Sequence, residues 1–150
     1  METVKQKIIV FFDVLKMLEK SIHLFDKYTD IFEKNPTEDN KDLFISMRNS
    51  MIQCFKYSTD LFWKVAEIYL EDVEKITLLS TSPRGIVRAA VNARVFSEVE
   101  GEQCMDMVES RNKTSHTYHE VTADEVAHEI PGYYEIMETI IDRMQNNSNS

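Results

Sequence analysis

The most regular feature of the chain is a seam of apolar residues near its start, spaced alternately by four and three positions. This heptad spacing is typical of a helix that packs one face against other helices. The Asn35-Pro36 pair predicts the end of that helix, and Thr37 followed by two acids predicts the start of the next. The seam consists of Val4, Ile8, Phe11, Leu15, Leu18, Ile22 and Phe25, with Phe32 one heptad further on.

A second long helix is predicted to follow, with two apolar seams side by side. A helix that is apolar over such a width lies centrally and contacts more than one neighbour. About 30 residues with a rise of about 1.5 Å each would make each helix roughly 45 Å long. Paired antiparallel through the short link at 35–40, the two helices would form the spine of a bundle. The seams are Phe44, Met47, Met51, Cys54, Ser58, Leu61, Val65 and Ile68, and Ile52, Phe55, Phe62, Ala66 and Tyr69.

Two shorter helices are predicted in the middle of the chain. Ser82 followed by Pro83 is typical of a helix start, because proline fits the first helical position. We expect this helix to run to about Phe96. A fourth helix is predicted over residues 100–115, with its apolar side chains turned inward.

The last helix is predicted after a short loop at 116–121. Thr122 and Glu125 have the spacing of a capping box, in which each side chain bonds to the other residue's backbone. No segment has the alternating pattern of a strand. We therefore predict an all-α fold: an up-and-down helical bundle of about five helices with a four-helix-bundle core. It would form a single domain over 1–145, and residues 146–150 would be a disordered tail.

Length and composition agree with one domain of long regular elements. The chain has 150 residues, 43% of them hydrophobic, and only three glycines and three prolines. Cys54 and Cys104 stand alone and are predicted to be reduced, buried thiols. The apolar run near the start is too short for a signal sequence or a membrane span. We therefore expect a cytoplasmic protein without a membrane segment.

The net charge of −9 argues against general coating of RNA, because non-specific binding to nucleic acid depends on cations. Basic residues gather in the third quarter of the chain, but acids are interspersed among them. Contact with a nucleic acid or a nucleotide should therefore be local, or come from a groove between two copies. The cations are Arg84, Arg88, Arg94, Arg111 and Lys113, and the acids are Glu98, Glu100, Glu102, Asp106 and Glu109.

Candidate chemistry is concentrated at the predicted end of the fourth helix. Arg111 is charged at any working pH and can fork onto two phosphate oxygens, and His116 can exchange a proton near neutral pH. Beside a phosphodiester these two groups suffice for phosphoryl-transfer chemistry without a metal. On a straight helix Asn112 shares a face with His116, and Arg111 shares a face with Ser115. A helix that ends near Ser115 would let His116 swing toward Arg111.

The same segment also fits a polar helix terminus, where Arg, Lys and His side chains interact favourably with the helix dipole. A metal site is not expected, because His116 and His119 follow the end of the helix and lose the spacing of paired ligands. No cofactor is expected either, because the three glycines are isolated and form no phosphate-binding loop.

Arg111, His116 and Tyr118 resemble the R-x4-H-x-Y signature of HEPN domains. The surrounding residues 107–120, MVESRNKTSHTYHE, more closely resemble the final motif of the nucleotidyltransferase substrate-binding protein family.

Two earlier segments resemble the same family, in the family's order. They are SPRGIVRAAVNARVF at 82–96 and MIQCFKYSTDLFWKVAEIYL at 51–70. One departure is visible, because the family often has a Gly-Leu-Ile turn where this chain reads Ala93-Arg94-Val95-Phe96. The geometry of that turn is therefore left open by the resemblance.

The resemblance implies a HEPN toxin: a homodimeric, metal-independent endoribonuclease held in check by a minimal nucleotidyltransferase antitoxin. That partner would transfer AMP to Tyr118 and so silence the site. His116 would act as general base or acid, Arg111 would stabilise charge on the phosphorane, and Asn112 would orient His116 or the phosphate, with Ser115 in support.

The family name implies an alternative, a non-catalytic subunit that presents a substrate or nucleotide to the transferase. In that case Arg111 would hold a phosphate without cleaving anything. A third interpretation is a purely structural partner in which the motif only caps a helix.

Overall fold

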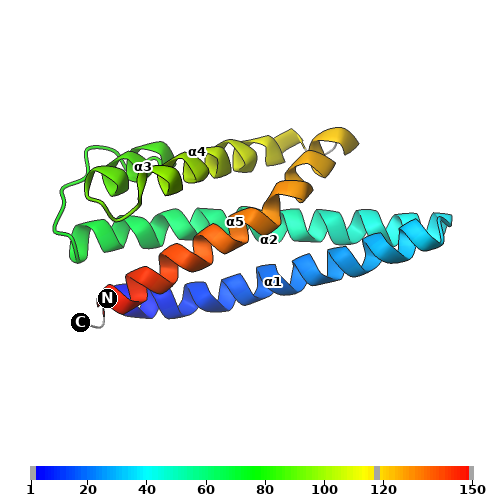
Figure 1. The fold of residues 1–150 in the computed structure, drawn as a ribbon, viewed down its shortest axis with the longest axis horizontal. Coiled ribbons are helices and arrows are strands. Elements are labelled where there is room, and N and C mark those ends of the chain that lie inside the picture. Colours follow the sequence, from blue (N-terminus) through cyan, green and yellow to red (C-terminus); the bar gives the residue numbers. More distant parts are fainter. Residues whose placement is uncertain (1–2, 117–118, 149–150) are drawn as a thin grey trace.

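The computed structural model describes residues 3–116 and 119–148. Within these ranges the chain is all-α, as predicted, and four of its helices run up and down the bundle (Figure 1). The two longest helices form an antiparallel pair, with α5 crossing obliquely and α4 above it. The elements are α1 (Val4–Lys34), α2 (Glu38–Asp72), α3 (Pro83–Asn92), α4 (Glu98–Lys113), the 3-10 helix η1 (Thr114–His116) and α5 (Glu120–Ser148).

Hydroxyl side chains fix the starts of the first four helices. Each N-cap hydroxyl accepts a hydrogen bond from the backbone N–H three residues further on, which would otherwise lack a partner. The predicted stop before Pro36 is confirmed, because α1 ends at Lys34. The N-cap residues are Thr3, Thr37, Ser82 and Ser97.

Helix α2 is the centre of the bundle, which confirms the prediction from its two apolar seams. It contacts α1, α3, α4 and α5. Its Phe62 is fully buried, and the ring lies 5.8 Å from that of Phe11 and 6.2 Å from that of Phe96, between ring centroids. A single ring therefore connects α1, α2 and the segment after α3.

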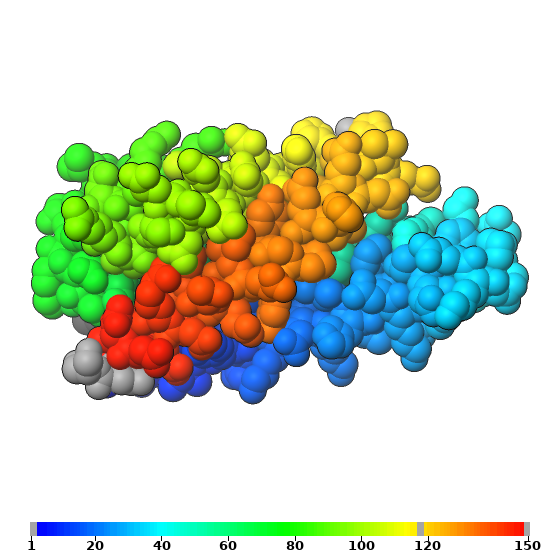
Figure 2. Space-filling model, viewed as in Figure 1, coloured from blue at the N-terminus to red at the C-terminus, as the bar shows by residue number. Residues whose placement is uncertain are grey.

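The far end of the α1–α2 hairpin extends beyond the other helices (Figure 2). Three aromatic rings hold this end together, with centroid distances of 5.4 Å between Phe25 and Phe44 and 5.5 Å between Phe32 and Phe44. The hairpin therefore has its own small apolar contact where no third helix covers it.

Helices α3 and α4 have different boundaries from those predicted. Helix α3 ends at Asn92 instead of about Phe96, and Arg94 takes a left-handed backbone conformation with φ of 60°. Helix α4 begins at Glu98, because Ser97 and Glu100 form a capping box. The turn between the helices is therefore tight even without a glycine.

A side chain from α5 supports this turn. Arg143 donates hydrogen bonds to the backbone oxygen of Val95 at 2.9 Å and to both carboxylate oxygens of Glu100, at 2.7 and 3.0 Å. This fork joins the start of α4 to the end of α5.

The predicted start of the last helix is wrong. Helix α5 begins at Glu120, so Thr122 lies inside its first turn and not at its cap. The backbone N–H of Ala123 donates to the oxygen of His119 at 3.0 Å, and the Ala123 side chain is fully buried. Tertiary packing therefore extends the helix past the local capping signal, and its other end also reaches beyond residue 145, to Ser148.

Neither cysteine is in a disulfide; Cys104 is buried and Cys54 half-buried. Within the described ranges, no helix combines the length and the apolar character that crossing a membrane would require.

We expect Gly132→Ala, in the interior of α5, to stabilise the fold by about 0.5 to 1 kcal/mol, because alanine loses less backbone entropy on folding. A Cβ at Gly132 would meet no atom within 4 Å. Gly101→Ala is the matched control, because its Cβ would lie 2.5 Å from Cγ2 of Val91, where α4 packs on α3. This second change should cost about 1 to 3 kcal/mol. Urea unfolding measures both, and a loss of stability in Gly132→Ala would contradict the expectation.

Candidate functional site

The candidate site forms where α4 gives way to η1. The hydroxyl of Thr114 donates to the backbone oxygen of Arg111 at 2.6 Å, and the hydroxyl of Ser115 donates to that of Asn112 at 2.9 Å. The same two carbonyls also accept from the backbone N–H of Thr114, so the side-chain hydroxyls add to the hydrogen bonds that close the helix end. The predicted helix end near Ser115 is thereby confirmed, with α4 ending at Lys113 and the 3-10 turn following it.

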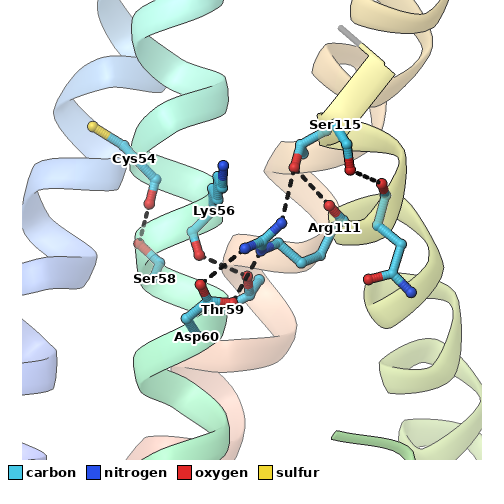
Figure 3. A network of polar contacts seen from close by, with 9 residues as sticks. Cys54, Lys56, Ser58, Thr59, Asp60, Arg111 and Ser115 are labelled. Atoms are coloured by element: carbon cyan, nitrogen blue, oxygen red, sulfur yellow. Dashed lines mark hydrogen bonds and ion pairs between the residues drawn. The ribbon is translucent and has the colours of Figure 1, made fainter.

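The side chain of Arg111 leaves α4 and reaches across to α2 (Figure 3). Its Nε and Nη2 atoms donate to the two carboxylate oxygens of Asp60, each at 3.0 Å. Its Nη1 atom donates to the hydroxyl of Thr114 at 3.1 Å. Asp60 and Thr114 therefore hold the guanidinium group from two sides.

This arrangement leaves part of the guanidinium group available to a ligand. An arginine has five N–H donors, and the described residues accept three of those of Arg111. One N–H on each terminal nitrogen remains, and the side chain is 23% exposed. Both donors lie in the plane of the guanidinium group and can be offered to phosphate oxygens.

The other predicted site residues lie along the same turn. Asn112 and Ser115 are joined by their hydrogen bond, and both are exposed. His116 ends η1 with an exposed side chain, and its backbone oxygen accepts from the N–H of His119 at 3.2 Å. Tyr118, the predicted modification site, lies outside the described residues.

Sequence reasoning did not identify Asp60 as part of the site. It lies 51 positions before Arg111, and nothing in the local spacing connects the two. Thr114 was not identified as a site residue either, although its hydroxyl accepts from Arg111 Nη1 and donates to the backbone oxygen of Arg111 at the helix end. The geometry therefore adds a carboxylate and a hydroxyl to the predicted set.

A buried polar network lies directly behind the site. The hydroxyl of Ser110 donates to the carboxylate of Glu129 and lies 3.0 Å from the hydroxyl of Tyr133, whose ring stacks on Phe55 of α2. Burial, together with the charge of Glu129, raises the pKa of Tyr133, so this hydroxyl stays protonated. The network fixes the last turn of α4 against α5 and α2.

Among the described residues, neither a reactive cysteine nor a metal site lies at this turn. Burial and the nearby charge of Glu100 raise the pKa of Cys104 to about 12, so its thiol is not a nucleophile at neutral pH. Across the described ranges, no three His, Cys, Asp or Glu side chains gather as metal ligands would. A hollow of about 470 Å³ beside α3, lined in part by Leu78 and Arg88, includes no residue of the turn.

Comparison with known proteins places the chain in a family. The profile of the family described as "Nucleotidyltransferase substrate binding protein like" matches residues 6–146. A crystal structure of a protein from Thermus thermophilus is similar, with 27% sequence identity and a TM-score of 0.63, over 85% of this chain and 98% of that one. No curated protein gave a significant match. Because the family profile covers nearly the whole chain, the protein belongs to the nucleotidyltransferase substrate-binding protein-like family.

Proposed function

We propose that this protein is the phosphate-binding subunit of a two-component nucleotidyltransferase, and that Arg111 holds the phosphate. The observation that carries the proposal is the fixed guanidinium group with two remaining donors at an exposed turn. Family membership supports the partnership with a transferase. In this function the chain binds and presents a ligand, and the partner supplies the transfer chemistry.

Binding of a short, fluorescently labelled single-stranded oligoribonucleotide tests the role of Arg111. Arg111→Gln should weaken binding by roughly 10- to 100-fold, because hydrogen bonds to charged groups contribute about 1.5 to 3 kcal/mol. Lys113→Gln is the matched control, since it removes the same charge two residues away on an exposed side chain. It should weaken binding less than about threefold, as expected for an exposed charge. Equal losses in both variants would show that Arg111 acts only as one charge among several.

RNA cleavage is the second candidate, favoured by the position of His116 at the exposed end of η1, five residues after Arg111. His116 would take the proton of a ribose 2′-hydroxyl or protonate the leaving 5′-oxygen, and Arg111 would stabilise the phosphorane. A homodimer would let one histidine act as base and the other as acid. Transfer of AMP to Tyr118 by the partner would add a bulky anion that competes for Arg111 and blocks the site.

Incubation of the purified protein with RNA separates the two candidates. Cleaved RNA with 2′,3′-cyclic phosphate ends, abolished by His116→Ala with binding retained, would establish the nuclease. Intact RNA would leave the phosphate-binding subunit as the remaining candidate.

The intact mass of the protein after co-expression with the transferase tests the modification. A gain in mass corresponding to AMP should disappear in Tyr118→Phe. Light scattering tests the homodimer.

A further inference from the structure

Asp60 occupies one of the two forks of the Arg111 guanidinium group. The contact is bidentate, with both nitrogen–oxygen distances at 3.0 Å, and Figure 3 shows the two side chains meeting between α2 and α4. The contact with Asp60 uses the Nε and Nη2 donors of Arg111, which lie along one side of the guanidinium group. The remaining N–H groups are on the two terminal nitrogens, so a phosphate would bind beside Asp60 and not in its place.

The carboxylate then lies close to any phosphate that Arg111 holds. The two forks of a guanidinium group point roughly 120° apart, which places a carboxylate in one and a phosphate in the other about 7 Å from each other. Asp60 and Arg111 together carry no net charge, so their pair offers directional donors without a surplus of positive charge. Each further negative charge on the ligand increases its repulsion from the Asp60 carboxylate.

We infer that Asp60 shifts the selectivity of the Arg111 site away from doubly charged phosphomonoesters and toward singly charged phosphodiesters. The inference rests on the proposed function, because it requires that Arg111 bind phosphate. The ligand that this shift favours is an internal phosphate of a nucleic acid strand, relative to the terminal phosphate of a free nucleotide. A phosphodiester has one negative charge, whereas a phosphomonoester, whose second pKa is about 6, has nearly two at pH 8.

Coulomb's law gives the size of the effect. At about 7 Å, with an effective dielectric constant between that of a protein surface and that of bulk water, each ligand charge loses about fourfold in affinity. Removing the Asp60 charge should therefore tighten binding about fourfold for a diester and about 15-fold for a monoester. The selectivity would change by about fourfold in favour of the monoester.

The test measures two dissociation constants by NMR titration at pH 8 and low salt, where screening is weak. The diester probe is thymidylyl-(3′→5′)-thymidine, which has no 2′-hydroxyl to attack, and the monoester probe is thymidine 5′-monophosphate. Asp60→Asn removes the charge and keeps one oxygen that can accept from Arg111, although it loses the second acceptor of the bidentate contact. Asp60→Glu keeps the charge and should keep the selectivity of the natural protein.

A matched control comes from the same helix. Asp42→Asn removes an equal charge from an exposed position on α2, about 27 Å from Asp60 at about 1.5 Å per residue, and should change neither constant. Thymidine, which has no phosphate, should bind all variants equally.

Each outcome decides between the proposals. If Asp60→Asn changes both constants by the same factor, or weakens both, the inferred selectivity is wrong while phosphate binding by Arg111 stands. If neither probe binds the natural protein or any variant, both the inference and the proposed function are wrong.

Discussion

Phe62→Ala is expected to lower the free energy of unfolding by about 3 to 5 kcal/mol, the range for truncating a fully buried aromatic side chain. Phe62 is 0% exposed, and besides Phe11 and Phe96 its ring meets that of Trp63 edge-on, with centroids 4.9 Å apart. Since these neighbours come from three different segments, no single one can move in to fill the space. Domains of this size have a total stability of about 5 to 15 kcal/mol, so the change would leave a marginal fold.

Urea unfolding monitored by circular dichroism measures the loss. Tyr57→Ala is the control, because it removes an aromatic ring from the same helix at a side chain that is 61% exposed, and should stay within about 0.5 kcal/mol of the natural protein. A loss below about 1.5 kcal/mol for Phe62→Ala would contradict the central position of α2, because it would mean that the core closes around the gap.

The sequence predicted most of the bundle, because its long helices have strongly periodic apolar seams. The errors lie at helix ends, where short signals compete. The Thr122–Glu125 spacing is a good capping signal, yet burial of Ala123 draws that segment into α5. Ser97 and Glu100 have the same spacing and do form a capping box. The spacing alone does not tell which of the two segments forms a capping box, because this depends on the tertiary contacts of the first turn.

The site was predictable only in part, for a different physical reason. The end of α4 near Ser115 was expected from the sequence, since a helix end is a local property of the backbone. The partner of Arg111 depends on how α4 packs against α2, and any of the 26 acids can pair with an arginine. Asp60 lies within the segment 51–70 that resembles the family, but only the packing of the two helices singles it out.

The charge of the whole chain and the geometry of the site agree. A net charge of −9 repels polyanions at long range, so a polyanionic ligand would have to be held by directional hydrogen bonds at short range. The guanidinium group of Arg111, fixed by Asp60 and Thr114, provides such bonds. Both candidate functions use this group, and only the role of His116 separates them.

Asp124→Ala is expected to cost about 1 to 3 kcal/mol, because it leaves the buried charge of Arg48 without its carboxylate; the cost lies below that for a fully buried ion pair, since the Asp124 side chain is 59% exposed. The side chain of Arg48 on α2 is only 5% exposed, and its Nη1 atom donates to Asp124 of α5 at 2.8 Å. Its contacts with Asn49 are long, at 3.4 and 3.5 Å, and cannot replace that bond.

Arg48→Met should cost less than about 1 kcal/mol, because it removes the buried charge and fills the space with an apolar chain of similar length. The double variant should then be nearly as stable as Arg48→Met alone. Equal losses in the two single variants would instead mark an ordinary surface salt bridge. Asp124 lies in the second turn of α5, shortly after the segment with His116. Hydrogen exchange at the start of α5 should therefore rise in Asp124→Ala and stay unchanged in Arg48→Met, because only the first variant leaves a charge that draws water between α2 and α5.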